Sequence, residues 1–444
     1  MDLSGKTVLV VGLGRTGQEC ARFLARQGAK VRVNDLRSAA DLALEMGTLA
    51  GLPIEYCSAG EPASWLASID VVVPSPGVPR DNAWLRQAVA RHIPVLGEIE
   101  LAYRSFRAPL VAVTGTNGKS TTTTLIGEMM KAGGHRVFVG GNLGVPFISA
   151  VSNDWDWAVL EISSFQLEWI EQFRPHIAVL LNVTEDHLDR YVSFADYRAT
   201  KERIFEVQGG EDVAILNRDD PWIWAMRNRI KARIVSFGFT EVTEGVFATA
   251  SEIIWRAGAG EERFALDEVK IQGVHNVENM MAAVAAAKCA GVPCELIQTT
   301  LNRFPGLEHR LEFVRNKDGV RYYNDSKGTN VGAVVKSLAS FNEPVILLAG
   351  GVDKGGDYAP LNEEIKQKVR RLVLFGAAKE VIAHALGALT ETVIVDDLQA
   401  AVREAAAHAH AGDVVLLSPA CSSFDQFSNY AERGKVFKSL VQKL

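Results

Sequence analysis

Short apolar runs rich in β-branched residues alternate along this chain with longer segments at helical spacing. The run at residues 7–11 leads into a glycine-containing turn at 12–17 and a helical segment that continues to residue 27. A second run then follows at 31–34. Continuous apolar strands separated by helices are typical of parallel βαβ units, in which helices cover both faces of a sheet. The pattern therefore predicts an α/β fold.

The same alternation recurs in two later parts of the chain. A second series of runs lies at residues 110–114, 158–161 and 177–182, and a third lies at 345–349, 372–375, 393–395 and 414–417. Segments around 92–98 and 302–310 separate the three series. A chain of 444 residues also suits about three domains, because domains usually hold ~100–200 residues each.

We therefore predict three α/β domains in series. A Rossmann-like domain is expected at 1–97, a central P-loop-type mononucleotide-binding domain at 98–305, and a C-terminal Rossmann-like parallel sheet at 306–444. The stretch at 209–266 is less regular, and we expect it to include antiparallel strands.

Charge and cysteine content exclude several classes of protein. The 47 basic and 53 acidic residues give a formal net charge of −6, so the chain as a whole does not attract nucleic acid or anionic membranes. The five cysteines are scattered without a C-x-x-C pair, which argues against a disulfide framework or a zinc knuckle. No apolar run approaches the ~20 residues of a membrane span, and the N-terminus does not resemble a signal peptide. We expect a cytoplasmic protein.

The most specific motif is TGTNGKST at residues 114–121, between a predicted strand and a predicted helix. Its glycines allow backbone N–H groups to face an anion, and the helix N-terminus adds partial positive charge. Lys119 can reach the terminal phosphates, and the Ser120 hydroxyl can ligate Mg²⁺. The spacing is two residues shorter than the usual P-loop, so we interpret the motif as a variant loop that binds ATP or GTP.

A magnesium–phosphate site needs further ligands from the ends of neighbouring strands, and a glutamate and a histidine lie at such positions. Glu161 ends one apolar run, and His187 lies in the loop after the next. Lys201 is ambiguous, because an ammonium repels a cation. It could serve Mg²⁺ only as an anionic carbamate, and a solvated helix lysine is the plainer interpretation.

The first domain carries a second phosphate-binding signature. Gly12, Gly14 and Gly17 form a G-x-G-x-x-G motif after a strand, and Asp35 ends the next strand. This is the dinucleotide fingerprint, but its geometry requires only a diphosphate on a helix N-terminus beside a sugar diol. A UDP-sugar satisfies it as well as NAD does, and Arg37 could assist either ligand. The motif predicts a second nucleotide-like ligand and is a weak indication of redox chemistry.

Three polar motifs in the third region each follow a predicted strand, on the side where doubly wound sheets bind ligands. They lie at residues 324–330, 350–355 and 418–427. Their lysines and hydroxyls suit a small dicarboxylate or a phosphate.

Together, these motifs resemble those of the Mur ligase superfamily. The shared motifs of the superfamily are TGTNGKST (114–121), GGNLGVP (140–146), EISSFQLE (161–168) and NVTEDHLDR (182–190). NDSKGTN (324–330), GGVDKG (350–355) and SPACSSFDQF (418–427) are similar to those of its D-glutamate-adding ligases. The resemblance spans all three regions in the family's order.

The resemblance implies an ATP-dependent amide ligase of cytoplasmic peptidoglycan precursor synthesis, which we expect to be a monomer. Such an enzyme phosphorylates the carboxylate of UDP-N-acetylmuramoyl-L-alanine, and the amine of D-glutamate then attacks the acyl phosphate. The implied cofactors are ATP and Mg²⁺, with two metal ions expected.

The resemblance also implies roles for individual residues. Lys119, His187 and Lys201 are the expected catalytic residues, with Lys201 carbamylated. The implied metal ligands are Ser120, Glu161, His187 and Lys201. Implied ATP contacts are Gly115, Thr116, Asn117, Gly118, Lys119, Ser120, Thr121, Asn276, Arg310 and Asp325. The implied contacts of the UDP-sugar substrate are Gly14, Arg15, Thr16, Asp35, Arg37 and Asn142. The D-glutamate pocket is expected to contain Lys327, Thr329, Lys354, Ser423 and Phe424.

Other interpretations remain open at this point. Within the same class, a sister Mur enzyme or a folylpolyglutamate synthase is the nearest alternative, although the G-x-G-x-x-G domain argues against the folate enzyme. An NAD-dependent oxidoreductase would leave the P-loop and the third domain unexplained. A non-catalytic nucleotide-binding scaffold would not need polar motifs in all three regions.

Overall fold

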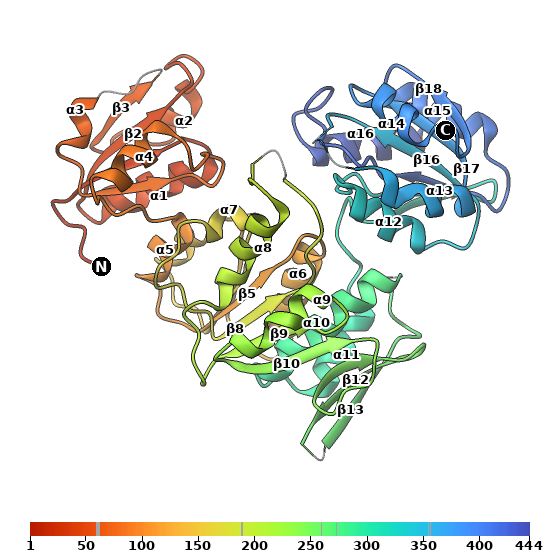
Figure 1. Ribbon diagram of the computed structural model, residues 1–444, viewed down its shortest axis with the longest axis horizontal. Coiled ribbons are helices and arrows are strands. Elements are labelled where there is room, and N and C mark those ends of the chain that lie inside the picture. Colours follow the sequence, from red (N-terminus) through yellow and green to blue (C-terminus); the bar gives the residue numbers. More distant parts are fainter. Residues whose placement is uncertain (59–62, 188–189, 259, 272, 354, 356) are drawn as a thin grey trace.

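Three separate β-sheets organise the protein in the computed structural model, which describes residues 1–58, 63–187, 190–258, 260–271, 273–353, 355 and 357–444. Figure 1 shows the first domain (red to orange) and the last domain (blue) on either side of the central one (orange to green). The predicted three-domain α/β fold is confirmed. The exact domain boundaries stay predictions.

The first sheet is parallel and has the strand order β3-β2-β1-β4. Its strands are β1 (Thr7–Val11), β2 (Lys30–Asp35), β3 (Ile54–Ser58) and β4 (Val71–Pro74). The connecting helices are α1 (Arg15–Arg26), α2 (Ala43–Gly47) and α3 (Ala63–Leu66), and α4 (Ala83–Ala90) follows the last strand. β4 is apolar and buried throughout, and β1 is apolar and buried after its first residue, Thr7, as expected for strands covered on both faces.

The central sheet has nine strands in the order β13-β12-β11-β10-β9-β8-β5-β7-β6. Six are β5 (Leu110–Thr114), β6 (Val137–Gly141), β7 (Trp157–Glu161), β8 (Ile177–Leu180), β9 (Val213–Asn217) and β10 (Arg233–Gly238). The others are β11 (Gly245–Ala248), β12 (Glu252–Ala257) and β13 (Gly260–Ala265). β12 pairs antiparallel with both β11 and β13, which confirms the antiparallel strands expected in this stretch.

Helices surround the central sheet and bring its loops together. They are α5 (Glu98–Tyr103), α6 (Lys119–Ala132), α7 (Ser164–Leu167), α8 (Phe194–Glu202), α9 (Pro221–Ala225), α10 (Val274–Cys289) and α11 (Cys294–Arg303). The buried faces of α6 and α10 pack in one apolar cluster with β5 and β8. This packing places the N-termini of α6 and α10 beside each other at the end of β5.

The third sheet has the order β14-β15-β19-β16-β17-β18. Its strands are β14 (Glu312–Lys317), β15 (Val320–Asn324), β16 (Val345–Gly350), β17 (Val369–Phe375), β18 (Glu391–Ile394) and β19 (Val414–Leu417). Its helices are α12 (Val331–Ala339), α13 (Asn362–Lys368), α14 (Lys379–Leu386), α15 (Leu398–His408) and α16 (Tyr430–Gln442). β14 pairs antiparallel with β15, an edge strand that the sequence pattern did not indicate. Among the helices of the described residues, none has the length and apolar composition needed to cross a bilayer.

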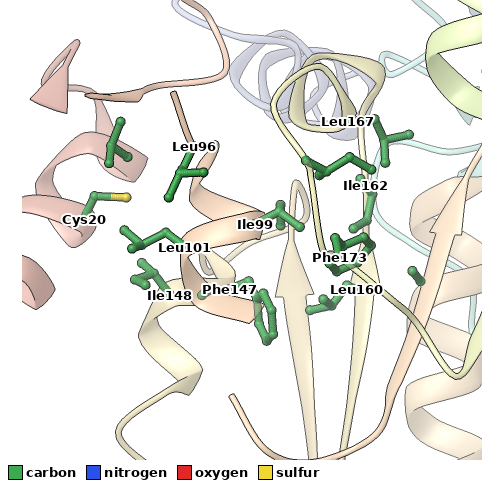
Figure 2. Close-up of a cluster of buried hydrophobic side chains, with 14 of the residues drawn as sticks. Cys20, Leu96, Ile99, Leu101, Phe147, Ile148, Leu160, Ile162, Leu167 and Phe173 are labelled. Atoms are coloured by element: carbon green, nitrogen blue, oxygen red, sulfur yellow. The ribbon is translucent and has the colours of Figure 1, made fainter. Parts of the chain in front are cut away.

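The first two domains share a continuous apolar core. Figure 2 shows Cys20 of α1 and Leu96 of the linker beside Ile99 and Leu101 of α5, with Phe147 close to them. All five side chains are almost fully buried. Because α5 contributes to the cores on both sides, we infer that it fixes the first domain against the central one.

Two buried carboxylates on α5 are accommodated in different ways. Glu100 accepts hydrogen bonds from the backbone N–H of Glu171, Gln172 and Phe173 and pairs with Arg104 at 2.6 Å. Glu98 accepts from the backbone N–H of Ile148 at 2.7 Å. Burial raises the pKa of Glu98 from its ordinary 4.5 to about 7.

We predict that Glu98 makes stability depend on pH. The folded chain keeps the Glu98 proton up to a pH near 7, whereas the unfolded chain loses it near 4.5. The free energy of unfolding should therefore fall as pH rises through this window, by about 3 kcal/mol. Glu98→Gln removes the titrating group, so the variant should gain stability relative to the parent over the same window. Urea unfolding at several pH values tests this, and a pH-independent difference between the two proteins would contradict it.

Candidate active site

The loop between β5 and α6 has the shape of an anion cradle. Gly118 starts α6 with a φ of +87°, and a Cβ there would lie 2.1 Å from Oδ1 of Asn279. Only glycine satisfies both constraints. The Nζ atom of Lys119 donates to the carbonyl oxygens of Gly115 and Thr116, at 2.8 Å each. The loop therefore holds the lysine at the N-terminus of a long helix, where an anion is favoured.

Neighbouring loops hold this cradle in place. The Asn182 side chain accepts from the backbone N–H of Asn117 at 2.8 Å and donates back to its carbonyl oxygen at 3.1 Å. The hydroxyls of Thr116 and Tyr197 lie 3.1 Å apart. The loop after β8 and the helix α8 thus hold the loop between β5 and α6 in place, and the roles of Thr116 and Asn117 in binding ATP stay predictions.

A buried carboxylate lies against the cradle. The Ser120 hydroxyl donates to Oε2 of Glu161 at 2.5 Å, and Nδ2 of Asn142 donates to Oε1 at 2.6 Å. Burial by itself would raise the pKa of Glu161, but the charges of Lys119 and Lys327 hold it below its usual range. Glu161 is therefore ionised at neutral pH and can neutralise a cation beside Ser120.

Two cations from the last domain reach the same serine. Nζ of Lys327 lies 2.8 Å from the Ser120 hydroxyl oxygen, and a terminal nitrogen of Arg310 lies 3.2 Å from it. Burial and the charges of Arg310 and Lys119 lower the pKa of Lys327 to about 7. The resemblance assigned Lys327 to the amino-acid pocket, and in this structure it contacts Ser120 at the start of α6.

A cavity of about 60 Å³ lies beside this contact, between the central and last domains. Its lining includes six residues that were predicted to bind the nucleotide: Asn117, Gly118, Thr121, Asn276, Arg310 and Asp325. Asp325 accepts from the hydroxyls of Ser337 and Ser418 at 2.7 Å each, and burial raises its pKa to about 6. Asp325 therefore anchors the loop of the last domain at the cavity wall.

Lys201 is buried in an unusual environment for a lysine. Its Nζ donates to the carbonyl oxygen of Gly115 at 2.9 Å and lies 4.7 Å from the centre of the Tyr197 ring. Burial, and then the charge of Lys119, lowers its pKa well below the ordinary value. The amine is thus held in an environment that favours its neutral form, which is the reactive form of a lysine.

His187 lies on the loop after β8 and is partly exposed. It adopts a positive φ of 56°. Its ring packs edge-on against the ring of Phe165, with 4.8 Å between the ring centres, and its ring centre lies 6.4 Å from that of Tyr197. Within the part of the chain that the structure describes, His, Cys, Asp and Glu side chains do not gather in a group of three that could hold a metal. Of the four predicted metal ligands, Ser120 and Glu161 are joined directly, by the hydrogen bond described above.

Glu168 connects this loop to the first domain. Its fully buried carboxylate accepts from Arg190 at 2.6 Å and from the Tyr191 hydroxyl at 2.9 Å, and Arg80 lies 3.4 Å away. Arg190 also donates to the carbonyl oxygen of Val78 in the first domain at 3.0 Å. Glu168 was not singled out from the sequence, because its partners lie far away along the chain. Its position at the end of the EISSFQLE motif was the available signal.

The glycine motif of the first domain forms the expected tight turn. Gly14 precedes α1, and a Cβ on Gly17 would lie 1.9 Å from the carbonyl oxygen of Gly12. Arg15 and Thr16 begin the helix, where an anion is favoured. Asp35 accepts from the backbone N–H of Leu13 at 2.7 Å.

Arg37 also lies against Asp35, with a terminal nitrogen 3.1 Å from its Oδ2. Although burial opposes it, the Arg37 hydrogen bond helps to lower the pKa of Asp35. Asp35 and Arg37 therefore brace the glycine turn in addition to their predicted ligand contacts.

The remaining predicted residues are distributed around the last domain. Thr329 lines a cavity of about 380 Å³ together with Asp186 and His187 of the central domain. Ser423 is buried, and Phe424 is 72% exposed. Neither residue lines this cavity, and Lys354 lies outside the described residues.

Comparison with known families covers most of the chain. The family described as "Mur ligase middle domain" matches residues 113–287, and "Mur ligase MurD-like, N-terminal domain" matches residues 6–97. "Mur ligase, glutamate ligase domain" matches residues 309–421. The chain belongs to the Mur ligase family. The predicted resemblance is confirmed.

Curated members of the Mur ligase family are similar over the whole length. The UDP-N-acetylmuramoylalanine--D-glutamate ligase of Geotalea uraniireducens is 50% identical, with 100% of this chain and 99% of that protein covered. The protein of the same name from Geobacter metallireducens is also 50% identical, with the same coverage.

Solved structures of Mur ligases share the fold. MurF from Acinetobacter baumannii superimposes with a TM-score of 0.64 at 18% identity, over 99% of this chain and 91% of that one. MurC from Thermotoga maritima gives 0.61 at 19% identity, over 99% of each chain.

We predict that Glu168→Gln destabilises the protein, because it removes the carboxylate that pairs with the largely buried guanidinium of Arg190. Removing one partner of a buried ion pair should lower the free energy of unfolding by about 3 kcal/mol. The matched control is Glu206→Gln, which breaks the 2.8 Å pair of Arg203 with a half-exposed carboxylate and should cost less than about 1 kcal/mol. Urea denaturation measures both, and equal losses would contradict the role of Glu168.

Proposed function

We propose that this chain is a UDP-N-acetylmuramoylalanine--D-glutamate ligase that uses ATP. The observation that carries the proposal is the 50% identity over the full length to curated relatives of that name. The contacts of Arg310 and Lys327 with Ser120 support it, because they bring the last domain to the phosphate-binding loop.

The proposed reaction has two steps. An oxygen of the UDP-N-acetylmuramoyl-L-alanine carboxylate attacks the γ-phosphorus of ATP, and ADP leaves with the electrons of the broken P–O bond. The amine of D-glutamate then attacks the acyl carbon, loses a proton, and expels inorganic phosphate as the amide forms. Phosphoryl transfer of this kind depends mainly on positioning and on charge neutralisation.

The cations around Ser120 suit the first step. Lys119, Arg310 and Lys327 would neutralise the triphosphate, and the N-terminus of α6 adds its backbone N–H groups. Asn276 and Asp325 line the adjacent cavity, where the rest of the nucleotide would lie. Lys327 interacts with the serine directly, and a bound phosphate would take over that contact.

The donor set around Glu161 fits magnesium. A serine hydroxyl and an ionised, buried carboxylate are hard oxygen ligands, which Mg²⁺ prefers. Ser120, Glu161, His187 and a carbamylated Lys201 would hold the metal, which supplies charge stabilisation to the phosphates when bound. The buried, neutral-favouring amine of Lys201 suits carbamylation, because carbon dioxide reacts with an unprotonated amine.

The outer domains would bind the other two substrates. The diphosphate of the UDP-sugar would lie on the N-terminus of α1, at Gly14, Arg15 and Thr16, beside Asp35 and Arg37. Asn142 would meet the muramoyl part. The D-glutamate pocket would be formed by the loops that carry Lys327, Thr329, Lys354, Ser423 and Phe424. We propose a cytoplasmic monomer, and the five cysteines, none of which forms a disulfide among the described residues, suit a reducing compartment.

The decisive assay is phosphate release from ATP with substrates added singly and together. We expect release only when UDP-N-acetylmuramoyl-L-alanine and D-glutamate are both present, because the amine is needed to complete the turnover. Faster turnover with L-alanine or a diamino acid would contradict the assignment to D-glutamate. Oxidation of NADH without ATP would contradict the ligase function itself.

We predict that Lys201→Ala abolishes turnover and that a short-chain carboxylic acid partly restores it. The acid would occupy the space vacated by the side chain and replace the carboxylate of the carbamate. Activity should fall by about 100-fold or more before rescue, as for other groups that hold a metal. Lys131→Ala on the exposed face of α6 is the matched control and should retain activity. Full activity of Lys201→Ala would reject the carbamate.

A further inference from the structure

Arg433 is a fully buried arginine in the first turn of α16. Each nitrogen of its guanidinium finds backbone or hydroxyl acceptors. Nε donates to the Ser326 hydroxyl at 3.0 Å, and one terminal nitrogen donates to the carbonyl oxygens of Ser326 at 2.9 Å and Cys421 at 3.1 Å. The other donates to the carbonyl oxygens of Gly350 and Ser422, at 3.3 Å each. All five N–H groups of an arginine are thus used.

These acceptors belong to three different loops. Ser326 follows β15, Gly350 ends β16, and Cys421 and Ser422 follow β19. The three strands are neighbours in the order β15-β19-β16, so their carboxyl ends meet at one edge of the sheet. The guanidinium lies where the three loops converge and binds all of them at once.

The loops are also close-packed around this point. Val352 and Ser422 exchange backbone hydrogen bonds at 2.9 and 3.1 Å, and a Cβ on Gly351 would lie 2.0 Å from the Ser422 carbonyl oxygen. The Ser326 hydroxyl, which accepts from Arg433, donates to the carbonyl oxygen of Tyr430 at 2.8 Å. A shift of any one loop would therefore leave a buried donor or acceptor without a partner.

Arg433 has no carboxylate of the described residues within salt-bridge distance. Burial lowers its pKa to about 10, so it still carries its charge at neutral pH. A buried charge that is solvated only by hydrogen bonds is costly to place in a protein. The cost of burying the Arg433 charge is explained if this residue positions the loops of a binding site and does not only stabilise the fold.

We propose that Arg433 is the positioning residue of the amino-acid pocket and holds the loops that carry Lys327, Thr329 and Ser423 in their binding arrangement. The inference rests on the proposed function, because the pocket is defined by its D-glutamate ligand. Arg433 itself lies behind the loops and acts through them. Lysine cannot replace it, because a single ammonium has three donors and cannot span three loops as a planar fork does.

The test compares steady-state kinetics of Arg433→Lys and Arg433→Ala with the parent enzyme. We expect the KM for D-glutamate to rise by about 10-fold or more in both variants, and the KM for the UDP-sugar to stay within about twofold, since the UDP-sugar is bound by the first domain. Arg433→Lys keeps the charge and much of the volume of the side chain. Its KM for D-glutamate therefore decides the test if Arg433→Ala does not fold.

Arg371→Ala is the matched control, because Arg371 is also buried in the last domain. It pairs instead with Glu391 at 2.7 Å and Glu404 at 2.8 Å, at the start of β17. We expect this control to lower the melting temperature and leave the KM for D-glutamate unchanged. An unchanged KM in folded Arg433→Lys, or an equal rise in KM in the control, would overturn the proposal. Absence of D-glutamate-dependent phosphate release in the parent enzyme would instead overturn the proposed function.

Discussion

The hydrogen bond between Ser120 and Glu161 is the interaction around which the central and last domains meet. It places an ionised carboxylate at the N-terminus of α6, where a lone negative charge could not be buried without cations around it. Lys119 supplies one cation from the same loop, while Arg310 and Lys327 come from the last domain. The central and last domains therefore meet at the serine, and this contact is made by the charges that a bound phosphate would also need.

Local charge outweighs overall charge in this protein. The formal net charge is −6, and every proposed substrate is an anion, so long-range attraction cannot bring them in. Recognition must come from the N-termini of α1 and α6 and from a few placed cations. Burial and like charge lower the pKa of Lys327 to about 7, and Lys201 is shifted in the same direction. Because these cations repel one another, an anion bound between them is stabilised strongly.

The sequence predicted the features that depend on short stretches of chain. The glycine turns before α1 and α6 and the strand–helix alternation are local patterns, and the structure contains them. The antiparallel strand β14 and the contact of Lys327 with Ser120 were not predicted, because both depend on residues brought together from distant segments. The same reason explains Glu168, whose partners Arg80 and Arg190 lie 88 and 22 residues away along the chain.

Two buried charges, Glu168 and Arg433, hold loops in place by the same physical means. Glu168 joins the loop that carries His187 to the first domain, and Arg433 joins the ligand loops of the last domain to one another. In both cases the buried charge accepts or donates several hydrogen bonds, and an apolar residue of the same size could not specify the same loop geometry. Such charges add little to stability by themselves, because desolvation offsets the attraction. Their contribution is a single arrangement of the loops, which a reaction between three separately bound ligands requires.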